Sequence, residues 1–340
     1  MIAPLLENKL IIALGAGGVG KTSSSLLLAI RAAQAGKRVG LLSIDPAKRL
    51  ADALGLKFGG EATRINFPEN CKVDGTLDAA MLDAKVVFDS MVTNYAPSPK
   101  IADKILNLPL YQAASTHLGG IVEYMALVKV QQMYDSGTYD LIVLDTPPDS
   151  HALDFLDRPN ILADFVENGV MSWLIKPFML AQRFGLGSLM NAGENLMGGL
   201  AQVTGIKALH MMAEFFSLMH EVVGGFNKIG SRIKTILQDP KTSFALVTTP
   251  KSAAIRSASN LIFQLKARNF ALDLLLFNRC LKTAQDPIDQ KRLAAERQLI
   301  EKLKKESEAL GIRPAQISQI YENEKSMQDM VNLCAMARDL

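Results

Sequence analysis

The segment Gly15-Ala16-Gly17-Gly18-Val19-Gly20-Lys21-Thr22 constrains the fold of this chain more than any other part. It has the spacing of a phosphate-binding P-loop (Walker A) motif. The context agrees, because residues 10–14 form an apolar run of strand length, and residues 21–35 have a helical pattern that ends before Gly36. A glycine-rich turn from a buried strand into a helix indicates a parallel α/β sheet.

Other apolar runs repeat this alternation of strand and helix. They lie at residues 38–43, 77–82, 141–144, 244–248 and 272–277. Short buried strands that alternate with helices need crossover connections, and such connections make neighbouring strands parallel. The sequence therefore predicts an α/β fold with a doubly wound, mostly parallel sheet of the P-loop NTPase type.

The loop and the helix after it carry the groups that a triphosphate needs. Glycines let the backbone curl so that N–H groups point at phosphate oxygens, and the helix N-terminus adds partial positive charge. We expect Lys21 to neutralise the β- and γ-phosphates and the Thr22 hydroxyl to ligate Mg²⁺. The alternative is a glycine-rich turn without a ligand, but the complete motif in this context favours a phosphate site.

Two aspartates follow predicted strands on the same edge of the sheet. Asp145 ends the apolar run 141–144 in a Walker B arrangement, and it is expected to hold Mg²⁺ directly or through water. Asp45 follows the strand at 38–43, and two roles fit its position. It can orient the attacking water in line with the γ-phosphate, or it can cap the next helix with Pro46 at the first helical position.

Three segments together resemble the ArsA family of ATPases. They are Gly17-Gly18-Val19-Gly20-Lys21-Thr22, Ser43-Ile44-Asp45-Pro46-Ala47 and Asp145-Thr146-Pro147-Pro148-Asp149-Ser150-His151-Ala152-Leu153-Asp154-Phe155-Leu156. That family includes bacterial arsenite-pump ATPases and the eukaryotic guided-entry ATPase that delivers tail-anchored membrane proteins. Order and spacing agree from about residue 10 to residue 157, and a weaker match continues through 247–250 and 277–279.

The resemblance implies roles beyond those that the residues alone suggest. Asp45 would lie in switch I and position the hydrolytic water, residues 145–151 would form switch II, and Asn278 would hydrogen-bond the adenine. One P-loop per chain implies a nucleotide-sandwich homodimer. The resulting set has Asp45 and Lys21 as catalytic residues, Thr22 and Asp145 as Mg²⁺ ligands, and nucleotide contacts from Gly15, Ala16, Gly17, Gly18, Val19, Gly20, Lys21, Thr22, Ser23 and Asn278.

Three features depart from the family pattern. Ala16 stands where the family has a signature lysine that reaches the partner subunit's phosphates, so that contact is lost. The guided-entry branch clamps its dimer with zinc through a CxxC, which this sequence lacks, so no zinc is expected. The three cysteines, Cys71, Cys280 and Cys334, fall outside the helical segment where metalloid binding would need them.

A methionine-rich segment interrupts the alternation of strands and helices. Residues 159–237 contain no convincing strand and hold seven of the 15 methionines, so we interpret them as an inserted helical subdomain. A second helical stretch at 101–133 is a candidate addition to it. The ATPase core would then comprise residues 1–158 and 238–340. The methionines fit either ordinary core packing or a flexible groove for an apolar helix.

Composition excludes several classes of protein. The chain of 340 residues is 49% hydrophobic, which argues against disorder, and its net charge of +3 without a long basic run gives a nucleic-acid partner little support. No segment reads as a signal peptide or a transmembrane helix, and three widely separated cysteines make a disulfide framework improbable. We therefore expect a cytoplasmic protein that is not itself transmembrane.

Three functions remain open at this point. The first is an ATPase chaperone or targeting factor that exposes a hydrophobic surface to a helical client or membrane-protein partner. The second is a regulatory nucleotide switch, which the loss of the lysine at Ala16 favours. The third is the motor subunit of an anion or metalloid pump.

Overall fold

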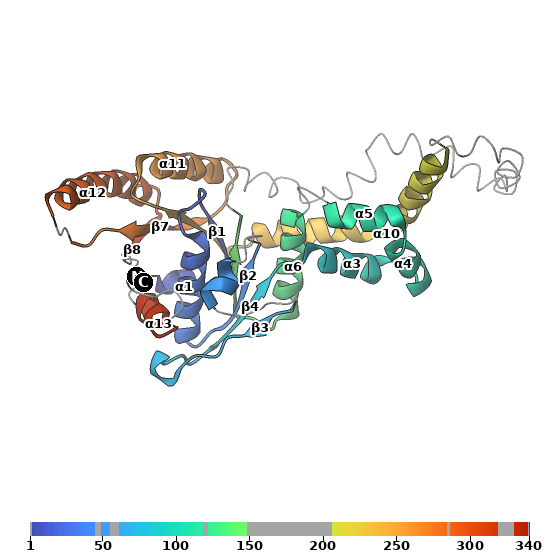
Figure 1. Cartoon of the computed structure of the whole chain (residues 1–340), viewed down its shortest axis with the longest axis horizontal. Coiled ribbons are helices and arrows are strands. Elements are labelled where there is room, and N and C mark those ends of the chain that lie inside the picture. The colour runs from blue at the N-terminus through green and yellow to red at the C-terminus, as the bar shows by residue number, and fades with distance from the viewer. Residues whose placement is uncertain are drawn as a thin grey trace, which may run out of the picture. The chain divides into compact units, whose positions relative to one another are not determined.

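The computed structural model describes residues 2–44, 49–54, 61–117, 122–147, 206–283, 286–318, 330–338 and 340 (Figure 1). These residues fall into two compact units. Unit 1 comprises Met1–Asp83, Ala126–Asp157 and Lys234–Leu340, and unit 2 comprises Ala84–Met125 and Arg158–Ile233. The division into 1–158, 159–237 and 238–340, with 101–133 as an addition to the insert, stays a prediction, because much of 159–237 lies outside the described residues.

Unit 1 is built on an eight-stranded sheet with the order β3-β4-β2-β5-β1-β6-β7-β8. Every neighbouring pair is parallel except β3 and β4, which are antiparallel. The predicted doubly wound, mostly parallel α/β sheet is therefore confirmed. The strands are β1 (Leu10–Leu14), β2 (Arg38–Ser43), β3 (Thr63–Arg64), β4 (Thr76–Met81), β5 (Leu141–Asp145), β6 (Thr242–Thr248), β7 (Leu272–Cys280) and β8 (Arg313–Ser318).

The helices of unit 1 follow the strands as crossover connections require. The first, α1 (Lys21–Gln34), begins at the predicted lysine and ends one residue before the predicted Ala35. The others are α2 (Arg49–Leu54), α11 (Ser252–Ala267), α12 (Pro287–Glu308) and α13 (Met330–Arg338), with short 3₁₀ turns η1 (Ala3–Glu7) and η2 (Glu69–Cys71). Asp286 caps α12, because its side chain accepts a hydrogen bond from the Asp289 amide, and Pro287 takes the first helical position.

The core of unit 1 lies on both faces of the sheet. All five residues of β1 are buried, as expected of a central parallel strand. Apolar residues of α1 and α13 join the alternate residues of the strands in one cluster that includes Ile11, Leu41 and Val143. Since α1 starts at the P-loop, this packing fixes the loop against the sheet.

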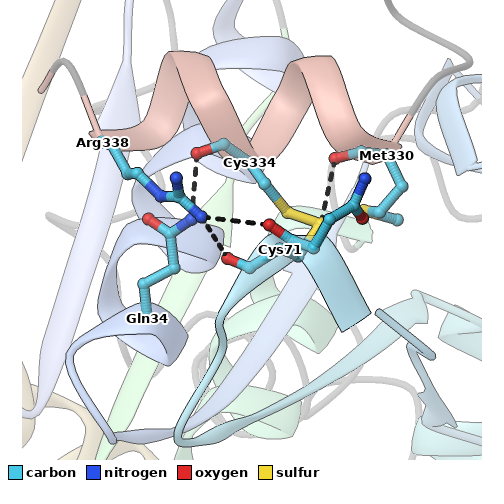
Figure 2. Close-up of a disulfide and its surroundings, with 6 residues drawn as sticks. Gln34, Cys71, Met330, Cys334 and Arg338 are labelled. Carbon is cyan, nitrogen blue, oxygen red and sulfur yellow. Dashed lines mark hydrogen bonds between the residues drawn. A yellow bond between two sulfur atoms is a disulfide. The ribbon is translucent and has the colours of Figure 1, made fainter. Parts of the chain in front are cut away.

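A disulfide joins Cys71 at the end of η2 to Cys334 in α13, across a sequence separation of 263 residues (Figure 2). We expected a disulfide framework to be improbable because the cysteines are far apart in the sequence, and this bond contradicts that reasoning, because distance along the sequence does not indicate distance in the fold. Hydrogen bonds surround the bond: Gln34 Nε2 donates to the Cys334 carbonyl at 2.9 Å, and the Arg338 guanidinium donates to the Cys71 carbonyl at 2.7 Å. Both cysteines are buried.

Unit 2 is helical in the part of it that the structure describes. It contains α3 (Ala84–Tyr95), α4 (Pro99–Leu106), α5 (Pro109–His117), the start of α6 (Val122–Ser136) and most of α10 (Ile206–Leu237). Phe88 stacks on Tyr111 with ring centroids 5.2 Å apart, and the Tyr111 hydroxyl donates to Asp89 at 2.8 Å. Lys104 and Glu214 form an ion pair at 2.8 Å between α4 and α10.

The long helix α10 has a buried and an exposed side where its side chains are described. Phe216 and Val223 are buried, and Glu221 is exposed. Met219 is also buried, so this methionine serves in packing. Gly225 is required by a close approach, because a Cβ atom there would lie 2.2 Å from the ring of Tyr95. Within the described residues, no helix has both the length and the apolar character needed to cross a bilayer.

Candidate functional site

Strand register brings the P-loop and Asp145 to one edge of the sheet. Asp145, the last residue of β5, lies beside Ala13 of β1 on one side and Ser43 of β2 on the other. The P-loop leaves β1 directly after Leu14. In a parallel sheet the carboxyl ends of the strands meet at one edge, which is where open α/β folds bind ligands. The predicted neighbourhood of the loop and the Walker B aspartate is therefore present.

The glycines of the loop have backbone conformations that other residues rarely adopt. Gly15, Gly18 and Gly20 have φ angles of +153°, +75° and +88°. Two of them also leave no room for a side chain: a Cβ atom at Gly15 would lie 2.3 Å from the Val247 carbonyl oxygen, and one at Gly20 would lie 2.2 Å from Asn278 Nδ2. A Cβ atom at Gly18 would meet nothing within 4 Å. The loop is thus packed against β6 and β7 at its ends and open in its middle.

Lys21 is the buried cation of this loop. Its side chain is 6% exposed, and its ammonium group donates to the Gly15 carbonyl at 2.8 Å and to the Ala16 carbonyl at 3.0 Å. Among the described residues no side chain caps the N-terminus of α1, where Gly20 takes the left-handed conformation. The backbone amides of a helix N-terminus, together with the Lys21 ammonium group, form an environment that favours an anion.

Asp145 is a buried carboxylate with hydroxyl neighbours on two elements. It is 1% exposed; Ser43 donates to its Oδ2 at 2.8 Å, and Ser25 of α1 lies 3.4 Å from its Oδ1. Sequence reasoning did not single out either serine. Ser25 lies three residues after Thr22, a spacing that places both on one face of α1. Ser43 directly precedes the Ile44-Asp45 pair, and both signals were available in the sequence.

This donor set fits a magnesium–nucleotide complex. Thr22 and Asp145 offer the hydroxyl and carboxylate oxygens that Mg²⁺ prefers, and Lys21 offers an ammonium group to phosphate. The carbonyl partners of Lys21 are neutral, so a phosphate oxygen would be the stronger acceptor for its ammonium group. In the described part of the chain, no cluster of three or more His, Cys, Asp or Glu side chains could hold a metal ion.

Asn278 lies near the end of β7, against the P-loop. It is 7% exposed, and its Nδ2 donates to the Val19 carbonyl at 2.9 Å while its Oδ1 accepts from the Arg279 amide at 2.9 Å. The contact to Val19 was not predicted from the sequence, where the two residues are 259 positions apart. The predicted adenine contact of Asn278 is a separate matter and stays a prediction.

The switch segments are described only where they leave the sheet. The Ile44 amide donates to the Asp145 carbonyl at 3.1 Å, and the Thr146 hydroxyl donates to the Ala13 carbonyl at 2.6 Å. Asp45 itself and residues 148–151 lie outside the described residues. Ile44 is therefore held against β5 and Thr146 against β1, and the proposed role of Asp45 rests on the sequence.

Comparison with known proteins agrees with this geometry over most of the chain. The sequence model of a family described as anion-transporting ATPase (ArsA) matches residues 8–318. The chain is 27% identical to "ATPase ASNA1 homolog 1" of Paramecium tetraurelia, over 80% of this chain and 78% of that protein. It is 28% identical to "ATPase GET3" of Mycosarcoma maydis, over 80% and 72%, and 27% identical to "ATPase GET3" of Phaeosphaeria nodorum, over 85% and 83%.

The match begins before β1 and ends with β8, so it includes the P-loop, Asp145 and Asn278. These are the residues that the fold gathers at the carboxyl edge of the sheet or against the loop. From the sequence motifs, the eight-stranded sheet and the match together, we conclude that this chain belongs to the anion-transporting ATPase (ArsA) family.

Proposed function

We propose that this chain, an ATPase of the anion-transporting ATPase family, uses the binding and hydrolysis of Mg-ATP to switch the conformation of a homodimer that handles a hydrophobic client. The observation that carries the nucleotide site is the buried Lys21 ammonium group folded onto the loop carbonyls at the uncapped start of α1. An anion that enters the loop would meet this ammonium group together with the amides at the start of α1, which is how a P-loop holds phosphate.

Each residue of the site has a proposed task. Lys21 and the amides of residues 15–20 would bind the β- and γ-phosphates, and Thr22 and Asp145 would hold Mg²⁺. Ser43 and Ser25 would keep the Asp145 carboxylate aimed at the metal, because they meet its two oxygens from different elements. Asp45 would orient the attacking water, and Asn278 and Ser23 would complete the nucleotide contacts.

Turnover by the Asp45→Asn variant tests the assignment of the water-orienting residue. We expect the variant to bind ATP nearly as well as the wild type and to hydrolyse it about 100-fold or more slowly, since positioning and electrostatic groups of this kind contribute on that scale. Steady-state phosphate release and equilibrium ATP binding measure the two quantities. Normal hydrolysis by the variant would remove Asp45 from the site and leave the helix-capping role.

Handling of a hydrophobic client is proposed from the inserted helical segment and from the relatives named ATPase GET3. Of the seven methionines in 159–237, Met219 is the one whose side chain the structure describes, and it is buried. The proposed groove rests on the sequence, because the other six methionines lie outside the residues whose side chains the structure describes. Flexible methionine side chains suit such a groove because they adapt to varied apolar surfaces.

The client proposal is tested with a fluorescent apolar helix of about 20 residues, the length of a membrane span. The Asp45→Asn variant is expected to hydrolyse ATP slowly, so the retention of this peptide can be compared between ATP-bound and ADP-bound protein. We expect retention in one nucleotide state only, and none for a control peptide with charges distributed along the helix. Equal, negligible retention of the apolar peptide in both states would rule out client handling.

A regulatory nucleotide switch is the second candidate, and Ala16 favours it. This residue replaces the lysine that would reach the partner's phosphates, and it packs against the core of unit 1. Tight ATP-driven closure is then weakened, and slow hydrolysis with recognition by a protein partner becomes the output. Sedimentation in ATP and ADP measures closure of the proposed homodimer, and equal assembly in both states would favour this second candidate.

The pump-motor alternative has less support. Cys71 and Cys334 are joined in a disulfide, and burial raises the pKa of the Cys280 thiol to about 12, so the cysteines do not offer the thiolates that bind metalloids. A hydrolysis rate that arsenite does not change would count against the pump.

We also propose that the protein is located in the cytoplasm. The disulfide is compatible with this reducing compartment, because its sulfur atoms lie in the interior, where a reductant reaches them only through local unfolding.

A further inference from the structure

The side chain of Asn278 is held at both ends by the backbone. Its Nδ2 donates to the Val19 carbonyl of the P-loop, and its Oδ1 accepts from the amide of Arg279. Arg279 has a φ of 57°, a left-handed conformation that costs energy for a residue with a side chain. The strained residue supplies the amide that orients the Asn278 carboxamide, so the nitrogen end of the carboxamide faces the loop.

The contact with Val19 has a consequence inside the loop. In a trans peptide the C=O of one residue and the N–H of the next point in opposite directions. Asn278 draws the Val19 carbonyl toward β7, so the amide of Gly20 is aimed to the other side. Gly20 is the residue immediately before Lys21, and its amide is among those that a P-loop presents to phosphate.

Steric fit reinforces this geometry. Gly20 has a φ of +88°, and a Cβ atom there would lie 2.2 Å from Asn278 Nδ2. The Val19–Gly20 peptide therefore packs directly on the carboxamide, and the glycine is needed both for its conformation and for this contact. Asn278 is itself buried near the end of β7, which pairs with β6 on one side and β8 on the other, so it provides a rigid support.

We propose that Asn278 is a positioning residue for the phosphate-binding loop, a role that rests on the proposed nucleotide site and is separate from contact with adenine. It holds the Val19 carbonyl away from the phosphates and thereby holds the Gly20 amide toward them. The carboxamide nitrogen has a second hydrogen, which can meet an acceptor on the base. One residue would then link the base end of the site to the phosphate end.

The loop without nucleotide gives the first test, through hydrogen exchange of the backbone amides in residues 15–22. Asn278→Ala removes the support, and Asn278→Asp keeps the shape but replaces the donor with an oxygen that repels the Val19 carbonyl. We expect exchange in this segment to be at least about fivefold faster in both variants, since a held loop opens less often. Asn260→Ala, which removes an exposed carboxamide from α11, is the matched control and should leave the rate unchanged.

Inorganic tripolyphosphate, which lacks a base, gives the second test as a competitor of ATP binding. If Asn278 positions the loop, Asn278→Ala and Asn278→Asp should weaken the binding of tripolyphosphate at least about fivefold. The affinity for ATP should fall by at least a similar factor, because ATP uses the same phosphate contacts. Unchanged exchange and unchanged tripolyphosphate binding, with only ATP affinity reduced, would overturn the proposal and leave a contact with the base. Failure of the wild type to bind ATP would instead reject the nucleotide site itself.

A double-mutant cycle tests the contact between Gly20 and Asn278 itself. If the Gly20 backbone abuts Asn278 as described, Gly20→Ala should harm loop exchange less in the Asn278→Ala background than in the wild type, because the clash is removed. Strictly additive effects would show that the two residues do not act through this contact.

Discussion

Loss of the Cys71–Cys334 bond should lower the stability of unit 1 by several kcal/mol. The bond closes a loop with a sequence separation of 263 residues in a chain of 340. The chain-entropy relation for a loop of that size gives an upper value of about 5.6 kcal/mol at 25 °C. Measured losses generally fall below the relation, so we expect a decrease of about 2–5 kcal/mol in the free energy of unfolding.

The assay is thermal unfolding with and without dithiothreitol, followed in the wild type and in Cys334→Ala. A loss of this size corresponds to a Tm lower by roughly 5–15 °C for a unit of this length. Dithiothreitol reduces the Cys71–Cys334 bond to two thiols and is itself oxidised to a cyclic disulfide. The wild type should therefore lose stability in its presence. Cys334→Ala should start from a lower Tm and should not respond to the reductant, which separates the bond from the packing of α13.

A count of free thiols checks the premise. Denatured protein without reductant should show the thiol of Cys280 alone, and reduced protein should show all three. Three free thiols without reductant, or a wild-type Tm that dithiothreitol does not change, would refute the reasoning. In the second case the hydrogen bonds of Gln34 and Arg338 would be sufficient to hold α13 against α1 and η2.

Two further predictions concern the P-loop and the effect of pH. Gly15→Ala should destabilise the protein by about 2 kcal/mol or more and abolish ATP binding, since its Cβ atom would lie 2.3 Å from the Val247 carbonyl oxygen. Gly18→Ala has open space around its Cβ atom and should cost only about 1 kcal/mol. Chemical unfolding and ATP titration of both variants measure this difference, and equal effects would contradict the prediction. Burial raises the pKa of Cys280 to about 12, above the ordinary value of 9.0, so the unfolded chain loses this proton first, and stability should fall as pH rises from 9 toward 12. Cys280→Ala should show a shallower decline over that range in urea unfolding at fixed pH values, and an identical decline would show that Cys280 does not contribute.

The features that the sequence predicts well are the local ones. The five residues of β1 are apolar and the glycine loop follows directly, so the strand and the first residue of α1 could be located from neighbours alone. The Walker B aspartate could be placed because parallel strands end at one edge. The sequence did not predict β3, because a strand of two residues is too short to show an alternation of apolar and polar side chains. It did not predict β8, because Arg313, Pro314 and Gln316 interrupt the apolar run.

The features that the sequence did not predict depend on contacts between distant segments. The pairing of Cys71 with Cys334 and the contact of Asn278 with Val19 join residues more than 250 positions apart. Such pairs follow from the strand order, since β7 is brought near the loop by β6 and β1, and no local propensity encodes that order. The hydroxyl partners of Asp145 were missed for the same reason, because Ser43 and Ser25 meet it only once β2 and α1 are in place.

The most direct test of the nucleotide site is the affinity of the purified chain for ATP, measured by titration calorimetry with and without Mg²⁺. We predict magnesium-dependent binding in the wild type, at least about tenfold weaker in Lys21→Ala, since hydrogen bonds to a charged group contribute on that scale. Asn260→Ala, with its substitution exposed on α11, should bind as the wild type does. Wild-type protein that binds no ATP in the presence of Mg²⁺, or a Lys21→Ala variant that binds it equally well, would contradict the account.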